Sequence, residues 1–155
     1  MADNTNGTKA FNYRYDPSDY RTRQDGTDYT GNYFLEAEHL EAIYRDDDGD
    51  GEKLLAKYLR GVVVDEIVNG FEYSEAGEST NLTFHHDHLR SVVAITDHQG
   101  HTAWEGQYGP FGNILTEAGN INNRQKYTGR EMDEDTGLYY YRARYYDPEV
   151  GRFFD

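Results

Sequence analysis

Four residues between 46 and 51 have the spacing of a calcium-binding loop. Asp46, Asp48, Asp50 and Gly51 match positions 1, 3, 5 and 6 of the twelve-residue loop that coordinates calcium through carboxylates. Position 12, counted from Asp46, is Lys57, where that loop requires a bidentate carboxylate. A hairpin turn rich in Asp and Gly would account for the same four residues. The three aspartates are therefore weak calcium candidates, and the sequence predicts no cofactor.

Five of the six histidines lie between residues 85 and 101, which raises the question of a zinc site. On an uninterrupted strand, His86 and His88 would share one face while His85 pointed to the other. Two imidazoles at this spacing hold zinc only if a third ligand arrives from a neighbouring strand, and the sequence identifies none. Packing and hydrogen bonding at a strand end is the favoured interpretation.

Asp87, His88 and Ser91 have the residue types of a catalytic triad, and Asp147 and Asp155 have those of an aspartyl dyad. The triad residues are neighbours in one predicted strand, so their side chains need not converge. A dyad needs two carboxylates in contact so that one pKa rises, and Asp147 is more simply explained as a turn residue. The sequence therefore predicts no catalytic residue and a protein that is not an enzyme.

The charge and composition exclude several functional classes. With 29 acidic and 15 basic side chains, the net charge is −14. Such a surface repels phosphates and anionic membranes, so nucleic-acid binding is disfavoured as a main role. No apolar run approaches the roughly 20 residues of a membrane-spanning helix. The chain has no cysteine for a disulfide, and residues 1–7 lack the basic and apolar regions of a signal peptide.

Short aromatic stretches alternate with turn signals along the chain, which holds 15 Tyr and 16 Gly. Residues 11–15 alternate aromatic and polar side chains, the period of a half-buried strand. Turn signals recur about every 10 to 20 residues, and Asn69-Gly70 is expected to join two strands of a hairpin. The sequence predicts an all-β chain of antiparallel hairpins.

Two segments carry more specific expectations. Residues 33–44 contain good helix formers without Gly or Pro, but their apolar positions fit neither the helical period of 3.6 nor the strand period of 2. Two short strands around a tight connection are the favoured interpretation. One short helix near 33–44 is the alternative. Residues 138–146 are expected to form one strand. One face would carry Tyr139, Tyr141, Ala143 and Tyr145, and the other Tyr140, Arg142, Arg144 and Tyr146.

Long motifs in the second half of the chain resemble the repeat-associated core of the Rhs/YD-repeat family. Residues 127–133 read YTGREMD, residues 136–148 read TGLYYYRARYYDP and residues 151–153 read GRF, almost letter for letter the family's signature. Residues 85–92 (HHDHLRSV) and 108–113 (YGPFGN) resemble two further family segments, and residues 11–44 read as a degenerate YD repeat. The resemblance covers roughly residues 10–155.

This family includes bacterial polymorphic toxins, insecticidal toxin complexes and teneurins, and its antiparallel hairpins wind as a spiral into a hollow cocoon. The resemblance therefore implies that the chain is a strip of such a β-shell, in which the motif residues have structural roles. These residues are Tyr15, Asp16, Asp87, His88, Leu89, Pro110, Phe111, Gly112, Gly129, Arg130, Gly137, Leu138, Tyr139, Tyr141, Arg144, Tyr145, Tyr146, Asp147, Pro148, Gly151, Arg152 and Phe153.

The chain departs from the family's pattern at four places. One is residues 36–39, where Glu-Ala-Glu-His replaces a Gly-containing turn. Arg90 stands where the family usually has Gly, so that turn is expected to be reshaped, and Gly109 replaces the usual Asp before Pro110. Family members continue past Gly-Arg-Phe into an Asp-Pro segment, where an intramolecular aspartyl protease releases a toxin. The sequence stops at Asp155, so that segment is expected to be absent from this chain.

The resemblance divides the chain into a flexible N-terminal segment (1–9), degenerate YD-repeat hairpins (10–81) and the repeat-associated core region (82–155). It implies a shell component that encapsulates a C-terminal toxin and helps to deliver it, secreted by bacteria or associated with their surface. The expected partners are the remaining shell, the toxin cargo or a secretion apparatus, and another copy through exposed strand edges. The alternative is a cell-surface or extracellular module in which Tyr side chains and Trp104 bind a glycan or a protein.

Overall fold

The computed structural model describes residues 12–15, 21–25, 30–36, 39–45, 53–63, 66–74 and 76–154. Side chains are described for 42–44 and, with the same gaps, from residue 53 onward. The expected flexible segment 1–9, the calcium candidates Asp46, Asp48 and Asp50, and the motif residue Asp16 lie outside the described residues. Tyr15 is described by its backbone alone.

Ten antiparallel strands form the larger sheet, and each pairs with its neighbours in chain order. Period-two aromatic and β-branched stretches separated by Gly- and Asp-rich turns favour such a meander. The strands are β1 (Asn12–Tyr15), β2 (Arg21–Asp25), β3 (Thr30–Glu36), β4 (His39–Arg45), β5 (Lys53–Arg60), β6 (Ile67–Tyr73), β7 (Ser79–His86), β8 (Val92–Asp97), β9 (Thr102–Tyr108) and β10 (Ile114–Gly119).

A smaller antiparallel sheet follows, with the order β11-β12-β13-β14. Its strands are β11 (Glu131–Asp133), β12 (Leu138–Tyr140), β13 (Tyr145–Asp147) and β14 (Arg152–Phe154). The 3₁₀ helix η1 (Tyr127–Gly129) precedes it. It is the only helix among the described residues, and none of them forms a helix that could cross a membrane. The all-β prediction is confirmed.

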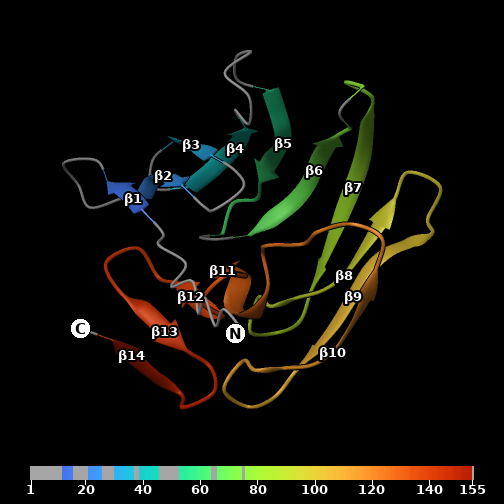
Figure 1. Ribbon diagram of the computed structural model, residues 1–155. Coiled ribbons are helices and arrows are strands. Elements are labelled where there is room, and N and C mark those ends of the chain that lie inside the picture. The colour runs from blue at the N-terminus through green and yellow to red at the C-terminus, as the bar shows by residue number, and fades with distance from the viewer. Residues whose placement is uncertain are drawn as a thin grey trace, which may run out of the picture.

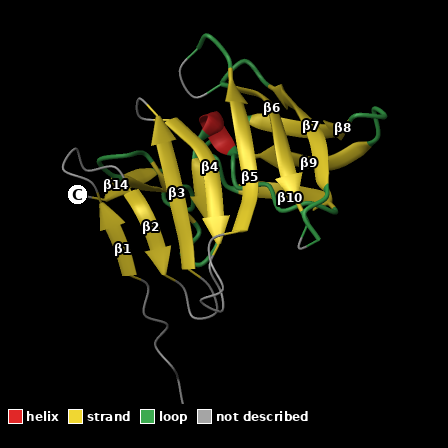
Figure 2. Ribbon diagram, turned by 90° about the horizontal axis from the view of Figure 1, so that it is seen from above, coloured by secondary structure: helices red, strands yellow, loops and turns green. Residues whose placement is uncertain are grey.

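The larger sheet is curved, and its strands follow an arc from β1 to β10 with β11 and β12 inside the arc (Figure 1). Figure 2 shows the same strands side by side from above. The core lies on the concave face, where apolar side chains from successive strands pack together. Its largest fully buried members are Trp104, Ile67, Leu82, Ile95 and Val92. The connection after β10 and the strand β11 cover this face. The change of sheet comes after β10, whereas residues 81 and 82, where the sequence motifs change, both lie in β7.

The expected hairpin turn at Asn69-Gly70 is wrong, because both residues lie inside β6. Gly70 allows a close approach: a Cβ at this position would lie 3.1 Å from the Phe84 ring and 3.2 Å from the Tyr58 ring. Asn69 donates a side-chain hydrogen bond to Asn81 on β7. The pair therefore serves cross-strand packing, and the chain turns between residues 61 and 66, where the N–H of residue 61 donates to the carbonyl of residue 66.

Residues 33–44 contain two strands, β3 and β4, which pair with each other. The favoured interpretation is confirmed and the helix alternative is wrong. Local helix propensity is overridden here by pairing on both sides, since β3 also pairs with β2 and β4 with β5. A register shift between Phe34 and Leu35 accounts for the irregular spacing of the apolar residues.

The single strand expected over residues 138–146 is wrong as well. β12 ends at Tyr140 and β13 begins at Tyr145, with a turn in which the N–H of Tyr141 donates to the carbonyl of Arg144. Arg142 takes a left-handed conformation in this turn (φ 62°), which no glycine announces in the sequence. The proposed division of side chains between two faces of one strand therefore does not hold.

A further turn separates β7 from β8, so His86 and His88 do not share a strand face. β7 ends at His86, and Asp87 begins a turn in which its side chain accepts the N–H groups of Leu89 and Ser91 at 2.8 Å each. Arg90 takes the left-handed conformation (φ 70°), the region that favours glycine. The turn therefore holds a non-glycine residue in a backbone conformation that favours glycine.

Arg90 also joins two turns. Its guanidinium lies 2.7 Å from the Glu66 carboxylate, in the turn before β6, and both side chains are partly exposed. An ion pair of this kind contributes roughly 0.2–1 kcal/mol. The left-handed backbone costs a non-glycine residue about 1 kcal/mol. The two effects nearly cancel at this position.

We expect Arg90→Gly to be at least as stable as the wild type and about 1 kcal/mol more stable than Arg90→Ala. Both variants lose the ion pair with Glu66, but only glycine removes the cost of the left-handed backbone. Urea unfolding of the three proteins measures the difference. Equal stabilities of the Gly and Ala variants would contradict the left-handed conformation of this residue.

Candidate functional site

Three tyrosine hydroxyls donate to three successive carbonyl oxygens of the loop between β9 and β10. Tyr127 of η1 donates to Pro110 (3.2 Å), Tyr146 of β13 to Phe111 (2.9 Å) and Tyr139 of β12 to Gly112 (2.9 Å). We refer to these three tyrosines as the tyrosine clamp. They attach the smaller sheet to the larger one through backbone acceptors, which are present whatever the loop side chains are. All six residues belong to the motifs that carry the family resemblance.

Glycines in the clamp make room for its rings. Gly112 has φ 89°, and a Cβ at this position would overlap the ring of Tyr127. Gly151 has φ 66°, and a Cβ there would lie 3.1 Å from the Phe111 ring. Both positions need the left-handed conformation as well as the space, which only glycine supplies without strain. The ring of Tyr127 also packs between those of Tyr108 and Tyr139, at centroid distances of 5.8 and 6.1 Å.

Burial keeps two hydroxyls of this region protonated. Tyr139 is fully buried, and the Tyr108 hydroxyl donates to the carbonyl of Val92 at 2.7 Å. Burial raises the pKa of both hydroxyls far above its usual value. They therefore stay protonated hydrogen-bond donors at neutral pH. Their chemistry is that of fixed structural donors and not of proton-transfer groups.

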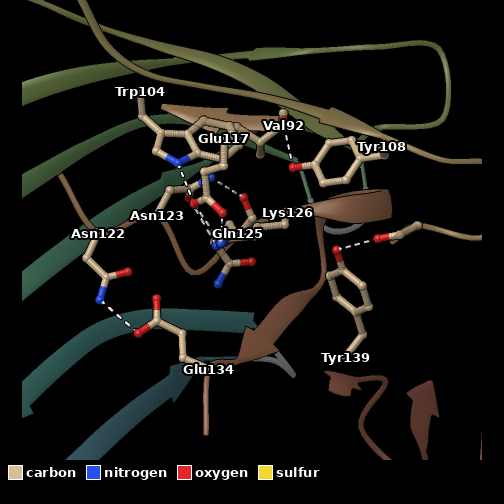
Figure 3. A network of polar contacts seen from close by, with 11 residues as sticks. Val92, Trp104, Tyr108, Glu117, Asn122, Asn123, Gln125, Lys126, Glu134 and Tyr139 are labelled. Atoms are coloured by element: carbon tan, nitrogen blue, oxygen red, sulfur yellow. Dashed lines mark hydrogen bonds and ion pairs between the residues drawn. The ribbon is translucent and has the colours of Figure 1, made fainter. Parts of the chain in front are cut away.

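A second polar network lies beside the clamp, on the concave face (Figure 3). The Glu117 carboxylate of β10 accepts the indole N–H of Trp104 at 2.8 Å and the ammonium of Lys126 at 2.8 and 2.9 Å. Lys126 is 3% exposed and Trp104 is 1% exposed. This ion pair, whose ammonium is buried and whose carboxylate is partly exposed, joins the edge strand β10 to the connection that crosses the core. Trp104 is thus unavailable for the surface binding that the alternative interpretation assigned to it.

The crossing connection is held by its own polar contacts. Asn123 is buried and its side chain both accepts the N–H of Gln125 and donates to the Gln125 carbonyl. The guanidinium of Arg124 lies 2.6 Å from the Glu131 carboxylate on β11. The Lys126 carbonyl accepts the N–H of Val92 at 3.0 Å, which ties this connection to β8. Sequence reasoning missed these residues, because they form no spaced motif and their burial depends on how the connection crosses the core.

An aromatic cluster covers the outer part of the smaller sheet. The rings of Tyr141, Tyr146 and Phe153 have centroids 5.1 to 5.8 Å apart. The guanidinium of Arg130 stacks on Tyr141 at 4.8 Å and that of Arg144 on Phe153 at 4.2 Å. Guanidinium groups of residues outside the strands therefore stack on the rings of this cluster. The hydroxyls of Tyr141 and Thr128 also share a short hydrogen bond.

Aspartates hold the turns. Asp97 accepts the N–H groups of Gln99 and His101, and Asp147 accepts that of Glu149 at 2.8 Å, as Asp87 does in its own turn. Backbone hydrogen bonds, that from His101 foremost, lower the pKa of Asp97. These carboxylates are fixed as acceptors within their loops.

The other motif residues complete turns and strands. Gly129 lies in η1, Gly137 has φ 72° in the turn between β11 and β12, and Pro148 is buried in the turn after β13. Leu138 begins β12, and Tyr145 opposes Tyr140 at a centroid distance of 5.4 Å. Arg152 is exposed on β14.

The described residues bring together no triad and no metal site. Ser91 is buried and its hydroxyl accepts the N–H of Thr128, whereas His88 is exposed in the turn. His85 shares a hydrogen bond with Thr96 at 3.0 Å. Among the described residues, no three His, Cys, Asp or Glu side chains could hold one metal ion. Asp155 of the dyad considered in the sequence lies outside the described part of the chain.

A cavity of about 380 Å³ separates the core face of the larger sheet from the turn after β11. Ile43, Tyr58 and Glu72 line one side, and Glu134 and Asp135 line the other. Burial raises the pKa of Glu72 to about 7. The protonation of this carboxyl therefore changes near neutral pH.

Comparisons with known proteins agree with the geometry. No protein-family model matches the chain. The tRNA3(Ser)-specific nuclease WapA of Bacillus spizizenii is 30% identical over 151 residues, and the tRNA nuclease WapA of Bacillus subtilis is 32% identical over the same length. Each match covers 91% of this chain and 6% of the relative, so the chain spans about one sixteenth of these proteins.

The fold recurs in a solved structure. The crystal structure of TcdB2-TccC3-TEV superposes on 99% of this chain and 8% of that chain, with a TM-score of 0.73 and 20% sequence identity. At this identity the likeness shows the fold, which is that of a small part of a much longer chain. The long motifs of the sequence and these similarities point to the same family.

We expect Tyr139→Phe to destabilise the protein by about 1–2 kcal/mol, since it leaves the buried Gly112 carbonyl without its donor. The matched control is Tyr73→Phe, whose hydroxyl donates to no described carbonyl, with an expected change below about 0.5 kcal/mol. Chemical denaturation measures both. Equal losses in the two variants would show that the clamp hydroxyl contributes nothing specific.

The Glu72 carboxyl predicts a pH dependence of stability. Its folded pKa lies above its usual value of 4.5, so folding becomes less favourable as the pH rises from about 4.5 to 7 and changes no further above that. We expect Glu72→Gln to stabilise the protein at pH 8 by about 1–2 kcal/mol, allowing for its partial exposure, and to have little effect near pH 4.5.

Melting curves at the two pH values test this expectation, with the exposed Glu78→Gln as the matched control. The control should leave the difference between pH 4.5 and pH 8 unchanged. A Glu72→Gln variant with the same pH dependence as the wild type would contradict the raised pKa.

Proposed function

Because the chain belongs to the Rhs/YD-repeat family, we propose that it forms one strip of a β-shell that encapsulates a toxic polypeptide and helps to deliver it. In this proposal the chain forms part of the shell wall and catalyses no reaction of its own. The nuclease activities in the relatives' names are those of proteins about sixteen times longer than the matched segment. The motif residues then act by holding turns and joining sheets.

The observation that carries the proposal is the strand order of the larger sheet. Ten strands follow one another in chain order, and every pairing is between sequence neighbours. Such a meander can be lengthened hairpin by hairpin at the β1 edge without a change in its existing pairings. Its curvature gives it an inner and an outer face (Figure 1). This is the geometry that a wall built from repeated hairpins needs.

The arrangement of aromatic side chains favours a wall over a binding module. The hydroxyls of Tyr108, Tyr127, Tyr139 and Tyr146 all donate within the chain, and the indole of Trp104 donates to Glu117. A glycan site would need several of these groups exposed around one hollow. They stabilise the contact between the two sheets instead.

The partners in this proposal are the remaining shell, the toxin cargo or a secretion apparatus. The location is the bacterial surface or the medium, as for a toxin that acts on other cells. The −14 charge is in keeping with a wall that stays soluble and does not bind nucleic acid. The division into repeat hairpins (10–81) and core region (82–155) is part of the proposal: the first would extend the wall and the second would fasten its end through the tyrosine clamp.

Protection of a passenger polypeptide tests containment in the complete product of the gene that holds this sequence. We expect the passenger to resist protease in the intact protein and to be digested about tenfold faster in Gly112→Ala, where the added Cβ overlaps Tyr127 and opens the clamp. The matched control is Gly77→Ala, which has the same left-handed backbone (φ 80°) but meets no atom within 4 Å.

Digestion is followed by mass spectrometry of passenger fragments. A passenger that is cut as fast in the intact protein as after unfolding of the shell would overturn the containment role.

A further inference from the structure

A groove of about 820 Å³ lies beside β10, the last strand in the order of the larger sheet. Leu89 and Leu115 are two of its apolar lining residues, and both are largely exposed. The acidic residues that line it are Asp87, Glu105 and Glu117, and no described Lys or Arg does. The groove is therefore apolar and acidic at once.

The three acids of the groove differ in how far they are already satisfied. Glu117 is neutralised by Lys126, and one oxygen of Asp87 accepts two backbone N–H groups within its own turn. Glu105 is exposed on β9, and its carboxylate has no ion pair or hydrogen bond with the described residues. Its charge is the one most available to a neighbouring molecule.

The backbone of β10 also has an open side. The N–H of Asn120 donates to the carbonyl of Ala103, and Ala118 is opposite Glu105 in the same register. Because N–H and C=O groups alternate in direction along an antiparallel strand, those of residues 117 and 119 point away from β9. No other described strand pairs with them. A strand from another molecule could pair there.

A complementary edge exists on the same chain, at β14. Arg152, Phe153 and Phe154 are all exposed, and β14 pairs with β13 alone among the described strands. Arg144 stacks on Phe153 and adds a second guanidinium to this edge. Residues 124–155 hold six of the 15 basic side chains but only seven of the 29 acidic ones. The negative charge is thus concentrated in the rest of the chain.

We propose that two copies of the chain associate head to tail, with the β14 edge of one copy in the β10 groove of the other. Arg152 then faces Glu105, and the exposed Phe154, on the same strand face as Arg152, covers Leu89 and Leu115. A contact between two grooves would bring acid against acid, so the charges favour a heterologous contact over a symmetric one. This inference goes beyond the proposed function and does not depend on it.

The contact is expected to be weak. β14 has three residues, so few backbone hydrogen bonds form, and each copy carries −14, which opposes association. Local attraction between Arg152 and Glu105 must therefore outweigh a general repulsion. Because the two effects differ in sign, charge variants can separate them.

The test compares Glu105→Arg with Glu78→Arg by sedimentation equilibrium over a range of concentrations. Both variants make the net charge less negative by the same amount, and Glu78 is exposed in the turn between β6 and β7, away from the groove. We expect association to weaken about tenfold in Glu105→Arg and to strengthen slightly in Glu78→Arg. Arg152→Glu should also weaken it about tenfold, against Lys57→Glu as its control.

Mixing the two weakened variants tests the head-to-tail geometry. The Glu105→Arg protein keeps its β14 edge and the Arg152→Glu protein keeps its groove, so an equal mixture should associate as the wild type does although neither variant does so alone. Circular dichroism confirms the fold of each variant. A wild type that stays monomeric at all concentrations, a mixture no better than its components, or equal effects of Glu105→Arg and Glu78→Arg would each overturn the proposal.

Discussion

Three tyrosine hydroxyls donated to three successive backbone carbonyls fix the smaller sheet against the larger one. The larger sheet consists of local pairings only, and a meander of this kind leaves one apolar face uncovered. The loop at residues 110–112 is where that face and the smaller sheet meet, through Tyr127, Tyr139 and Tyr146. Without its bond to Tyr139, the carbonyl of the buried Gly112 would lack a donor, at a cost of about 1–3 kcal/mol. The cover of the concave core therefore depends on the clamp.

The clamp and the ion pair of Lys126 act on opposite sides of the same connection. Lys126 precedes η1 directly, so its bond to Glu117 holds β10 while Tyr127 holds the loop before that strand. The Lys126 ammonium is buried, so loss of its carboxylate partner would be unfavourable. The edge strand, which has a neighbour on one side only, is thus held from the concave face. Pairing with β9 alone would leave it free to fray.

The fold class and most strands could be predicted from the sequence, because period-two aromatic stretches and Asp-Gly turns report local conformation. The wrong predictions concern positions where a residue type has a role other than its usual one. Gly70 serves close packing against Phe84 rather than a turn, and Arg90 and Arg142 take left-handed conformations without being glycine. The sequence motifs identified Tyr139 and Gly112 as structural residues, but they did not predict the contact between them. That contact joins residues 27 apart and depends on how two sheets meet, which no local pattern reports.

Donation to backbone carbonyls makes the contact between the two sheets independent of the loop's side chains. A tyrosine that donates to a backbone carbonyl makes the same bond whatever side chain the accepting residue has. Phe111, for example, accepts from Tyr146 through its backbone while the residue is 59% exposed. The constraints fall on the donors and on the glycines that make room for their rings. Exposed strand positions carry no such constraint and can vary in charge. A protein joined in this way can change the side chains on its surface while its two sheets remain attached.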